Sequence, residues 1–312
     1  MADPTHWVAG KYELVAPIGE GGMASVWLGL THGAAGFTRK VAIKRILPKL
    51  AVDSSFAALF VEEARVVSEL MHPNIIQIHD FDRDADGRHF IVMEWVEGID
   101  LESYVRSFGA EPTPWALVTA IGIEVLRALA AAHERTDASG TLAPIIHRDV
   151  NPANILIGIN GVVKLADFGL ARAMDRVSMT APGVVKGKLG YLSPEILMGK
   201  PANQRTDLFG VGITLWEALT KRRLFGGHPD VIVRVRDAVV PPLRDERGDL
   251  PPSLVEVVHC ALAAKPEDRF ESAEEMQRAL ASILRGQPEP TDARPLGRSI
   301  REARARLREG KA

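Results

Sequence analysis

Two short polar runs place the strongest constraint on this chain. Residues 147–154 read His-Arg-Asp-Val-Asn-Pro-Ala-Asn, and residues 167–169 read Asp-Phe-Gly. Asn154 follows Asp149 by five residues, and Asp167 follows Asn154 by thirteen. A carboxylate can take a proton from a hydroxyl group, whereas an amide oxygen and a second carboxylate suit hard cations such as Mg²⁺. These residue types make the two runs candidates for acid–base chemistry and for binding a divalent cation.

The same runs match H-R-D-x-x-x-x-N and D-F-G, the catalytic-loop and metal-loop pattern of protein kinases. Other segments follow in the order of that family: a glycine-rich turn at 19–25, Val-Ala-Ile-Lys at 41–44 and Leu-Ser-Pro-Glu at 192–195. Over about residues 8–286 the chain resembles the eukaryotic-like serine/threonine protein kinases. The asparagine at 151 and the long link before residue 147 resemble a subset of bacterial kinases, which implies a bacterial origin.

Hydrophobic patterns divide the chain into a strand-rich and a helix-rich part. Up to residue 97, β-branched and alternating runs predict a sheet with one helix, at residues 56–70. Beyond residue 98, long apolar stretches predict helices, notably at 114–133 and 206–219. The resemblance implies an α+β, bilobal protein kinase fold. The expected parts are an N-terminal extension (1–10), a kinase domain (11–286) with a β-rich N-lobe (11–97) and a mainly helical C-lobe (98–286), and a linker with a basic helical tail (287–312).

Composition narrows the class of protein. Of the 312 residues, 46% are hydrophobic and 25% charged, and the formal net charge of −2 argues against a nucleic-acid binder that acts through positive charge. Cys260 is the only cysteine, so an intrachain disulfide is excluded and a reducing compartment fits. The start does not read as a signal peptide, and no charge-free run of about 18 apolar residues occurs. We therefore expect a cytoplasmic protein without a transmembrane span.

A glycine-rich turn and a lysine are candidates for binding phosphate groups. Gly19, Gly21 and Gly22 lie between two expected strands, and glycines let backbone N–H groups approach phosphates closely. A plain hairpin would also explain them, whereas a dinucleotide-binding fold requires a helix directly after the glycines and a strand is expected instead. The resemblance implies that Lys44 contacts the α- and β-phosphates of ATP and pairs with Glu63.

Further residues are assigned to ATP by the resemblance alone. The adenine would contact apolar side chains, a gatekeeper methionine and the hinge, and an acid would meet the ribose. As an alternative, the same apolar residues belong to an ordinary core. The apolar candidates are Ile18, Val26, Ala42 and Leu156. The gatekeeper candidate is Met93, the hinge candidates are Glu94 to Val96, and the candidate for the ribose is Asp100.

The resemblance also gives roles to the polar runs. Asp149 is expected to be the catalytic base, and Asn154 and Asp167 the ligands of Mg²⁺, with Mn²⁺ as the alternative metal. An arginine beside the catalytic aspartate contacts a phosphorylated activation loop in this family. Ser178 and Thr180 are the candidate phosphorylation sites in that loop.

Three residues are expected to be structural. In the family, the glutamate that closes the activation segment pairs with a distant arginine, which predicts a pair between Glu195 and Arg269. Asp207 matches the acid that braces the catalytic loop.

Two residues depart from the family pattern. Asn151 replaces a lysine that contacts the γ-phosphate, and Lys188 replaces a threonine beside the catalytic aspartate. Loss of one charge-assisted contact costs about 1.5–3 kcal/mol, or roughly 10–150-fold in rate, which slows an enzyme without abolishing it. Because the base and both metal ligands are present, we expect an active kinase rather than a pseudokinase. One hypothesis is that Lys186 or Lys188 supplies the missing positive charge.

The C-terminal tail lies outside the resemblance. Residues 287–295 read as a linker, and residues 298–311 as a basic helix with an apolar stripe of Ile300, Ala303 and Leu307. Such a helix could dock on the kinase, on a partner protein or on acidic lipid, or it could be a solvated end.

Together these features predict a protein kinase that transfers the γ-phosphate of ATP to Ser or Thr of protein substrates and phosphorylates its own activation loop. The alternatives are an ATP-binding pseudokinase that acts as a signalling scaffold and a small-molecule kinase of similar fold. The Pro194-Glu195 close of the activation segment argues against the small-molecule kinase, because that segment serves protein substrates. The sequence leaves open whether the chain forms a homodimer.

Overall fold

The computed structural model describes residues 7–21, 24–51, 54–168, 189–227, 230–287 and 291–310, without the side chains of Lys49, residues 54–57, Leu59, Glu62 and Glu63. The described chain divides into two compact units. The first comprises residues 7–71 and 76–95, and the second comprises residues 72–75, 96–168 and 189–310 with the gaps given above.

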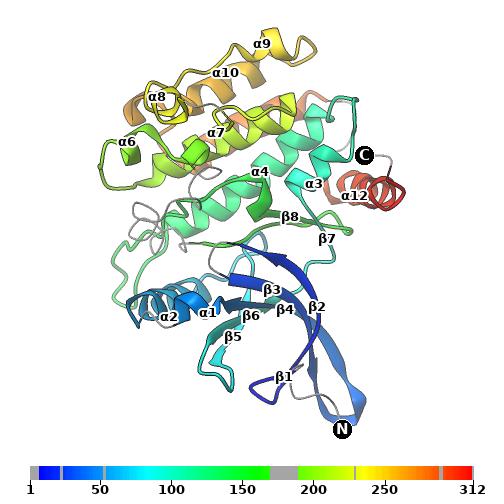
Figure 1. Ribbon diagram of the computed structural model, residues 1–312. Helices are drawn as coiled ribbons and strands as arrows, with labels where there is room; N and C mark the ends of the chain where they lie inside the picture. Colours follow the sequence, from blue (N-terminus) through cyan, green and yellow to red (C-terminus); the bar gives the residue numbers. More distant parts are fainter. Residues whose placement is uncertain are drawn as a thin grey trace. The chain divides into compact units, whose positions relative to one another are not determined.

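The first unit is a six-stranded antiparallel sheet with two helices (Figure 1). The strands lie in the order β1-β2-β3-β4-β6-β5. Their bounds are β1 Trp7–Val8, β2 Tyr12–Glu20, β3 Ala24–His32, β4 Thr38–Ile46, β5 Ile78–Arg83 and β6 His89–Glu94, and the helices are α1 Pro48–Ala51 and α2 Ser54–Ser68.

Alternation along β4 explains how this sheet forms a core. Val41 and Ile43 point to one face and are 2% and 0% exposed. With other apolar residues they form a single cluster, namely Val8, Tyr12, Leu14, Val41, Ile43, Phe90 and Val92. Val8 belongs to β1, which pairs with β2, so residues expected as an N-terminal extension take part in this core.

The second unit is mainly helical and carries a small sheet of β7 Gly98–Asp100, β8 Ile155–Gly158 and β9 Val163–Leu165. Helices α4 and α7 lie side by side at its centre (Figure 1). The helices are α3 Leu101–Arg106, α4 Trp115–His133, α6 Pro194–Leu197, α7 Gln204–Thr220, α8 Val231–Arg236, α9 Leu243–Glu246, α10 Pro252–Ala261, α11 Ala273–Arg285 and α12 Ala293–Arg308.

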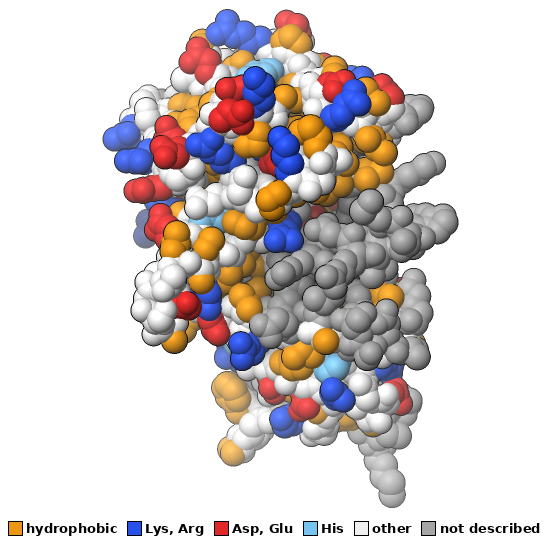
Figure 2. Space-filling view, turned by 90° about the vertical axis from the view of Figure 1, so that its left-hand side faces the viewer, with side chains coloured by type: hydrophobic (Ala, Val, Ile, Leu, Met, Phe, Trp, Pro, Cys, Tyr) orange, Lys and Arg blue, Asp and Glu red, His pale blue; other side chains and the backbone are white. Residues whose placement is uncertain are grey.

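Helix α4 is long and apolar enough to cross a membrane by length and composition, with a mean hydropathy of 1.6. It packs against α7 and α11, and 61% of the apolar window is buried inside the protein. This burial identifies α4 as a core helix. On the face drawn in Figure 2, acidic and basic side chains are interspersed over the described surface.

The tail departs from the prediction of a linker up to residue 295. Helix α12 begins at Ala293, where Asp292 caps it by accepting a hydrogen bond from the Arg294 N–H. Pro295 falls in the first helical turn, where the missing proline N–H costs nothing because that group has no intrahelical partner. The sequence pattern therefore places the start of this helix too late, because proline and charged residues are typical of a linker.

Candidate active site

One face of the sheet in the first unit gathers the side chains expected around ATP. Lys44 lies on β4, opposite Val26 on β3 and Ile91 on β6. One step along the face, Ala42 lies opposite Met93. Because side chains alternate along strands, these residues share the face opposite to the apolar core. Lys44 is only 7% exposed, as expected for a lysine with a specific role in a sheet.

The glycine-rich turn joins β2 to β3. Gly19 pairs with Val26, and the Gly21 N–H donates to the Ala24 carbonyl over 2.9 Å. A Cβ atom added at Gly19 would meet no atom of the described residues within 4 Å, so packing against them does not require a glycine there. Open space above the backbone is what close approach of a ligand needs. Ile18, beside this turn, is 50% exposed.

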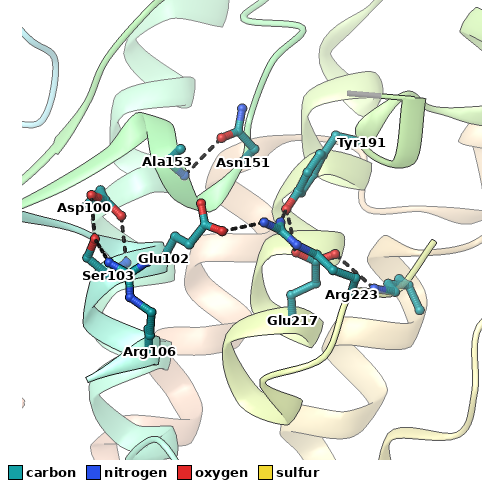
Figure 3. Close-up of polar contacts among 10 residues, drawn as sticks. Asp100, Glu102, Ser103, Arg106, Asn151, Ala153, Tyr191, Glu217 and Arg223 are labelled. Atoms are coloured by element: carbon teal, nitrogen blue, oxygen red, sulfur yellow. Dashed lines mark hydrogen bonds and ion pairs between the residues drawn. The ribbon is translucent and has the colours of Figure 1, made fainter. Parts of the chain in front are cut away.

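Two strands of the second unit hold other candidate ATP contacts. Asp100 on β7 lies opposite Leu156 on β8, in register. The Asp100 carboxylate also caps α3, because it accepts the Ser103 N–H over 2.7 Å and the Ser103 hydroxyl over 2.9 Å (Figure 3). A ribose hydroxyl would therefore share this carboxylate with the helix cap. Glu94, which ends β6 in the other unit, accepts the Gln77 N–H.

The catalytic loop is held by a buried carboxylate on α7. Asp207 Oδ2 accepts the backbone N–H of His147 over 2.8 Å, and Oδ1 accepts that of Arg148 over 2.7 Å. Oδ2 also accepts from His133 Nε2 over 2.8 Å. Asp207 is 1% exposed, so these bonds replace all hydration of its charge. The predicted bracing role of Asp207 is confirmed.

Arg148 has a left-handed backbone with φ 65°, which costs a non-glycine residue about 1–3 kcal/mol. The adjoining His147 ring is fully buried and fixed from two sides, donating through Nε2 to the Ala166 carbonyl and accepting the Asp149 N–H at Nδ1. Its centroid lies 4.5 Å from that of the Phe168 ring. His147 thus joins the catalytic loop to the Asp-Phe-Gly segment.

Two amides hold the candidate base. Asn151 Nδ2 donates to Asp149 Oδ1 over 3.0 Å, and Asn154 Nδ2 donates to Asp149 Oδ2 over 3.1 Å. Both amide nitrogens also bond the Asp149 carbonyl. Asn151 Oδ1 accepts the Ala153 N–H and so caps the following 3₁₀ turn (Figure 3). Asn151 therefore positions the carboxylate by a hydrogen bond at the place where the family usually has a lysine.

The residues expected to hold metal lie on adjoining segments. The Ala166 N–H donates to the Asn154 carbonyl over 2.8 Å, which ties the segment before Asp167 to the catalytic loop. Because the Asn154 amide nitrogen faces Asp149, its side-chain oxygen points the other way. Asp167 has φ 60°, a left-handed conformation. An amide oxygen and a carboxylate are ligands that fit a hard divalent cation.

A buried ion pair supports the second unit. Arg269 Nη1 and Nη2 each donate over 2.9 Å to the two oxygens of Glu195, and the remaining N–H groups bond the carbonyls of Arg205, Ala263 and Ala264. Burial alone would raise the pKa of the Glu195 carboxyl, but the hydrogen bonds and charge of Arg269 outweigh it, so this pKa lies below its usual value. The predicted pair is confirmed.

A model of the family described as "Protein kinase domain" matches residues 12–280. The chain belongs to the protein kinase family. The expected α+β kinase fold is thereby confirmed, and every polar residue described above falls within the matched segment, whereas α12 lies beyond it.

Solved and curated relatives agree with this assignment. The kinase domain of PknI from Mycobacterium tuberculosis is similar in structure, with a TM-score of 0.68 at 29% identity, over 90% of this chain and 99% of that one. Tyrosine-protein kinase MasK of Myxococcus xanthus is 39% identical over 92% of this chain and 45% of MasK. Serine/threonine-protein kinase PknL of M. tuberculosis is 38% identical (88% and 65%), and PrkC of Bacillus subtilis 35% (86% and 40%). The kinase chain thus spans less than two thirds of these three curated relatives.

One cluster of this kinase escaped the sequence analysis. Arg223 donates to Glu102 over 2.5 Å and to Glu217 over 3.1 Å (Figure 3). The Tyr191 hydroxyl accepts a further hydrogen bond from Arg223 and donates one to Glu217. Burial raises the pKa of Glu217, and hydrogen bonds from Tyr191 and the Leu224 N–H oppose the rise only in part. Glu102, Glu217 and Arg223 line a cavity of about 380 Å³, which Pro152 of the catalytic loop also lines. A polar residue inside an apolar helix, Glu217, was the available signal.

Several predicted residues lie outside the part of the chain that the structure describes. They are Gly22, the Glu63 side chain, the candidate phosphorylation sites Ser178 and Thr180, and the two lysines at 186 and 188. These assignments stay predictions.

Proposed function

We propose that this kinase transfers the γ-phosphate of ATP to serine or threonine hydroxyls of protein substrates, with Mg²⁺ as the metal. One observation carries the proposal. The Asp149 carboxylate is held by hydrogen bonds from two amides on a loop that a buried aspartate anchors, which is how a general base is kept in position.

The residues divide the chemistry among them. Asp149 accepts the proton of the substrate hydroxyl as that oxygen attacks phosphorus. Lys44 balances negative charge on the α- and β-phosphates, and its burial strengthens the interaction because fewer waters screen it. Asn154 and Asp167 would hold the divalent cation, which when bound neutralises charge on the phosphate oxygens. Mn²⁺ has the same ligand preferences and is the second candidate metal.

The names of the relatives differ in the residue that accepts the phosphate. PknL and PrkC are named serine/threonine-protein kinases, whereas MasK, at 39% identity, is named a tyrosine-protein kinase. Lys188 replaces the threonine that usually supports serine/threonine specificity, which is compatible with a tyrosine acceptor. Tyrosine phosphorylation is therefore the second candidate function, and an acceptor of either kind fits the base at Asp149.

We further propose that the kinase acts in the cytoplasm and phosphorylates itself at Ser178 or Thr180. The arginine before the catalytic aspartate supports a phosphorylated loop, because guanidinium groups bind phosphate through paired hydrogen bonds. Association into a homodimer would let one copy phosphorylate the loop of another.

Incubation of the purified 312-residue chain with Mg-ATP, followed by phosphosite mass spectrometry, tests the proposal. Asp149→Asn is the inactive variant, and Asp230→Asn, at the exposed residue just before α8, is the matched control. We expect phosphoserine or phosphothreonine in the wild type and in Asp230→Asn but not in Asp149→Asn. Phosphotyrosine alone would support the second candidate. Nucleotide binding without any phosphate transfer, with Mg²⁺ or Mn²⁺, would contradict both and favour a pseudokinase.

A further inference from the structure

Helix α12 packs on the second unit although it lies beyond the family match. Leu296, Ile300 and Ala303 are 2%, 0% and 0% exposed, and they line the side of the helix that contacts β7, β8 and α3. Figure 1 shows the helix beside α3 and the strands β7 and β8. Two members of the expected apolar stripe are thus buried, and the helix docks on its own kinase domain.

The helix backbone touches the turn that follows β8. A Cβ atom added at Gly297 would lie 2.7 Å from the Ile159 oxygen and 2.9 Å from the Gly161 nitrogen. A Cβ atom at Gly161, which has φ +82°, would lie 1.8 Å from the Ala293 oxygen. Each side of the contact therefore presents a glycine, and only glycines allow so close an approach. Arg301 adds a hydrogen bond to the Ile159 carbonyl.

Polar contacts also fix the helix to α3 and to the residues that follow α3. The hydroxyls of Tyr104 and Ser299 are 2.7 Å apart. Arg306 Nε donates to the Ser107 carbonyl over 3.1 Å, and the guanidinium of Arg306 lies 4.8 Å from the centre of the Phe108 ring. These directional contacts pair the hydroxyls of Tyr104 and Ser299 and the Nε of Arg306, so α12 docks in a defined position rather than on an unspecific apolar surface.

The surface that α12 covers includes β7 and β8, the strands that carry candidate ATP contacts. Strand β7 holds Asp100 and pairs with β8 opposite Leu156, and β8 starts directly after Asn154 of the catalytic loop. The Ile159 N–H donates to the Glu97 carbonyl over 2.9 Å, which closes the end of the strand pair that α12 covers. Because the two strands are paired in register from Gly98 and Gly158 to Asp100 and Leu156, a shift at this end would also move those two candidate ATP contacts.

We propose that α12 is a positioning element of the nucleotide site, which fixes the β7–β8 pair so that Asp100 and Leu156 meet ATP. The inference rests on the ATP binding proposed above. It predicts that nucleotide affinity depends on a helix outside the kinase-domain match.

A pair of substitutions on one helix tests it in the 312-residue chain. Ala303→Asp places a charge on the buried face, and Ala305→Asp places the same charge two residues away on the exposed face. Binding of Mg-ATP is measured by calorimetry, and folding by urea unfolding. We expect Ala303→Asp to bind ATP about tenfold more weakly, which corresponds to a binding-competent fraction of about one in ten, and Ala305→Asp to match the wild type.

A milder pair covers the case in which Ala303→Asp does not fold. Tyr104→Phe removes the bond to Ser299, whereas Tyr12→Phe removes a comparable bond to Asp80 in the other unit. We expect Tyr104→Phe to raise the KM for ATP about threefold, with kcat and the KM for peptide unchanged, and Tyr12→Phe to leave all three unchanged. Folded variants of Ala303 and Tyr104 with wild-type nucleotide affinity would overturn the inference. A wild-type chain that binds no ATP would instead overturn the proposed function itself.

Discussion

Replacement of Asp207 by asparagine tests how the catalytic loop is held. The buried carboxylate accepts three hydrogen bonds, from the backbone N–H groups of His147 and Arg148 and from His133 Nε2. An asparagine of the same size has one acceptor oxygen and one NH₂ group. Whichever way the amide is turned, one of the two backbone N–H groups faces that NH₂ group and loses its acceptor.

The magnitude follows from these bonds. A buried N–H without a partner costs about 1–3 kcal/mol, and each retained bond weakens by about 1 kcal/mol when its acceptor loses the charge. We therefore expect Asp207→Asn to lower the free energy of unfolding by about 3–5 kcal/mol. Native proteins have a free energy of unfolding of about 5–15 kcal/mol, so the variant should fold wherever the wild type lies above the lower end of this range. Turnover should fall on the order of 100-fold, because Asp149 follows the released backbone directly.

Urea unfolding and steady-state kinetics measure the two effects, with Asp230→Asn as control. Asp230 is exposed and makes no side-chain cap, so its replacement should change stability by less than about 0.5 kcal/mol. A loss below about 1 kcal/mol in Asp207→Asn with normal turnover would refute the bracing argument.

Three further substitutions give distinct signatures. Asn151→Ala removes a side-chain hydrogen bond to the carboxylate of Asp149, the proposed base, and we expect kcat to fall about tenfold in steady-state assays while the KM for ATP is unchanged. Arg269→Leu leaves Glu195 buried without its cation and should cost about 3–5 kcal/mol in urea unfolding at pH 7. In the wild type the lowered pKa of Glu195 gives stability that is present above its unfolded pKa and lost as the pH falls through its folded pKa. In Arg269→Leu the pKa of Glu195 is raised, so the loss of unfolding free energy relative to the wild type should shrink below about pH 5. A loss that does not change with pH would contradict this. Arg223→Ala removes a half-exposed cation from Glu217, whose raised pKa already makes the free energy of unfolding fall as the pH rises. The loss should be about 1 kcal/mol in urea unfolding, and the decline above about pH 4.5 should steepen.

The residues that the sequence revealed share one property: their type and spacing carry the chemistry. The pairing of Glu195 with Arg269 and the bracing by Asp207 followed from family motifs and were confirmed. The strand face that holds Val26, Ala42, Lys44 and Met93 follows from alternation along strands, since a period of two fixes which side chains are neighbours.

Other features depend on contacts that no local pattern encodes. The left-handed backbone of Arg148 is stabilised by an acceptor 59 residues away, and propensity alone disfavours it for an arginine. Strand β7 has three residues and exists through its pairing with β8. Arg223 lies in a loop after α7, where a charged side chain is normally exposed to solvent, and its partners come from three segments: α3, the segment at Tyr191 and α7.

The first turn of α7 is where the two buried networks of the second unit meet. Asp207 in this turn bonds the catalytic loop, and the adjacent Thr206 donates to Glu195 over 2.9 Å. Arg269 closes the second network by donating to the Arg205 carbonyl in the same turn. Three successive residues thus tie the loop with the base to the end of the activation segment. Both networks are buried and hydrogen-bonded, so the end of the activation segment and the loop that carries the proposed base Asp149 are held by the same helical turn.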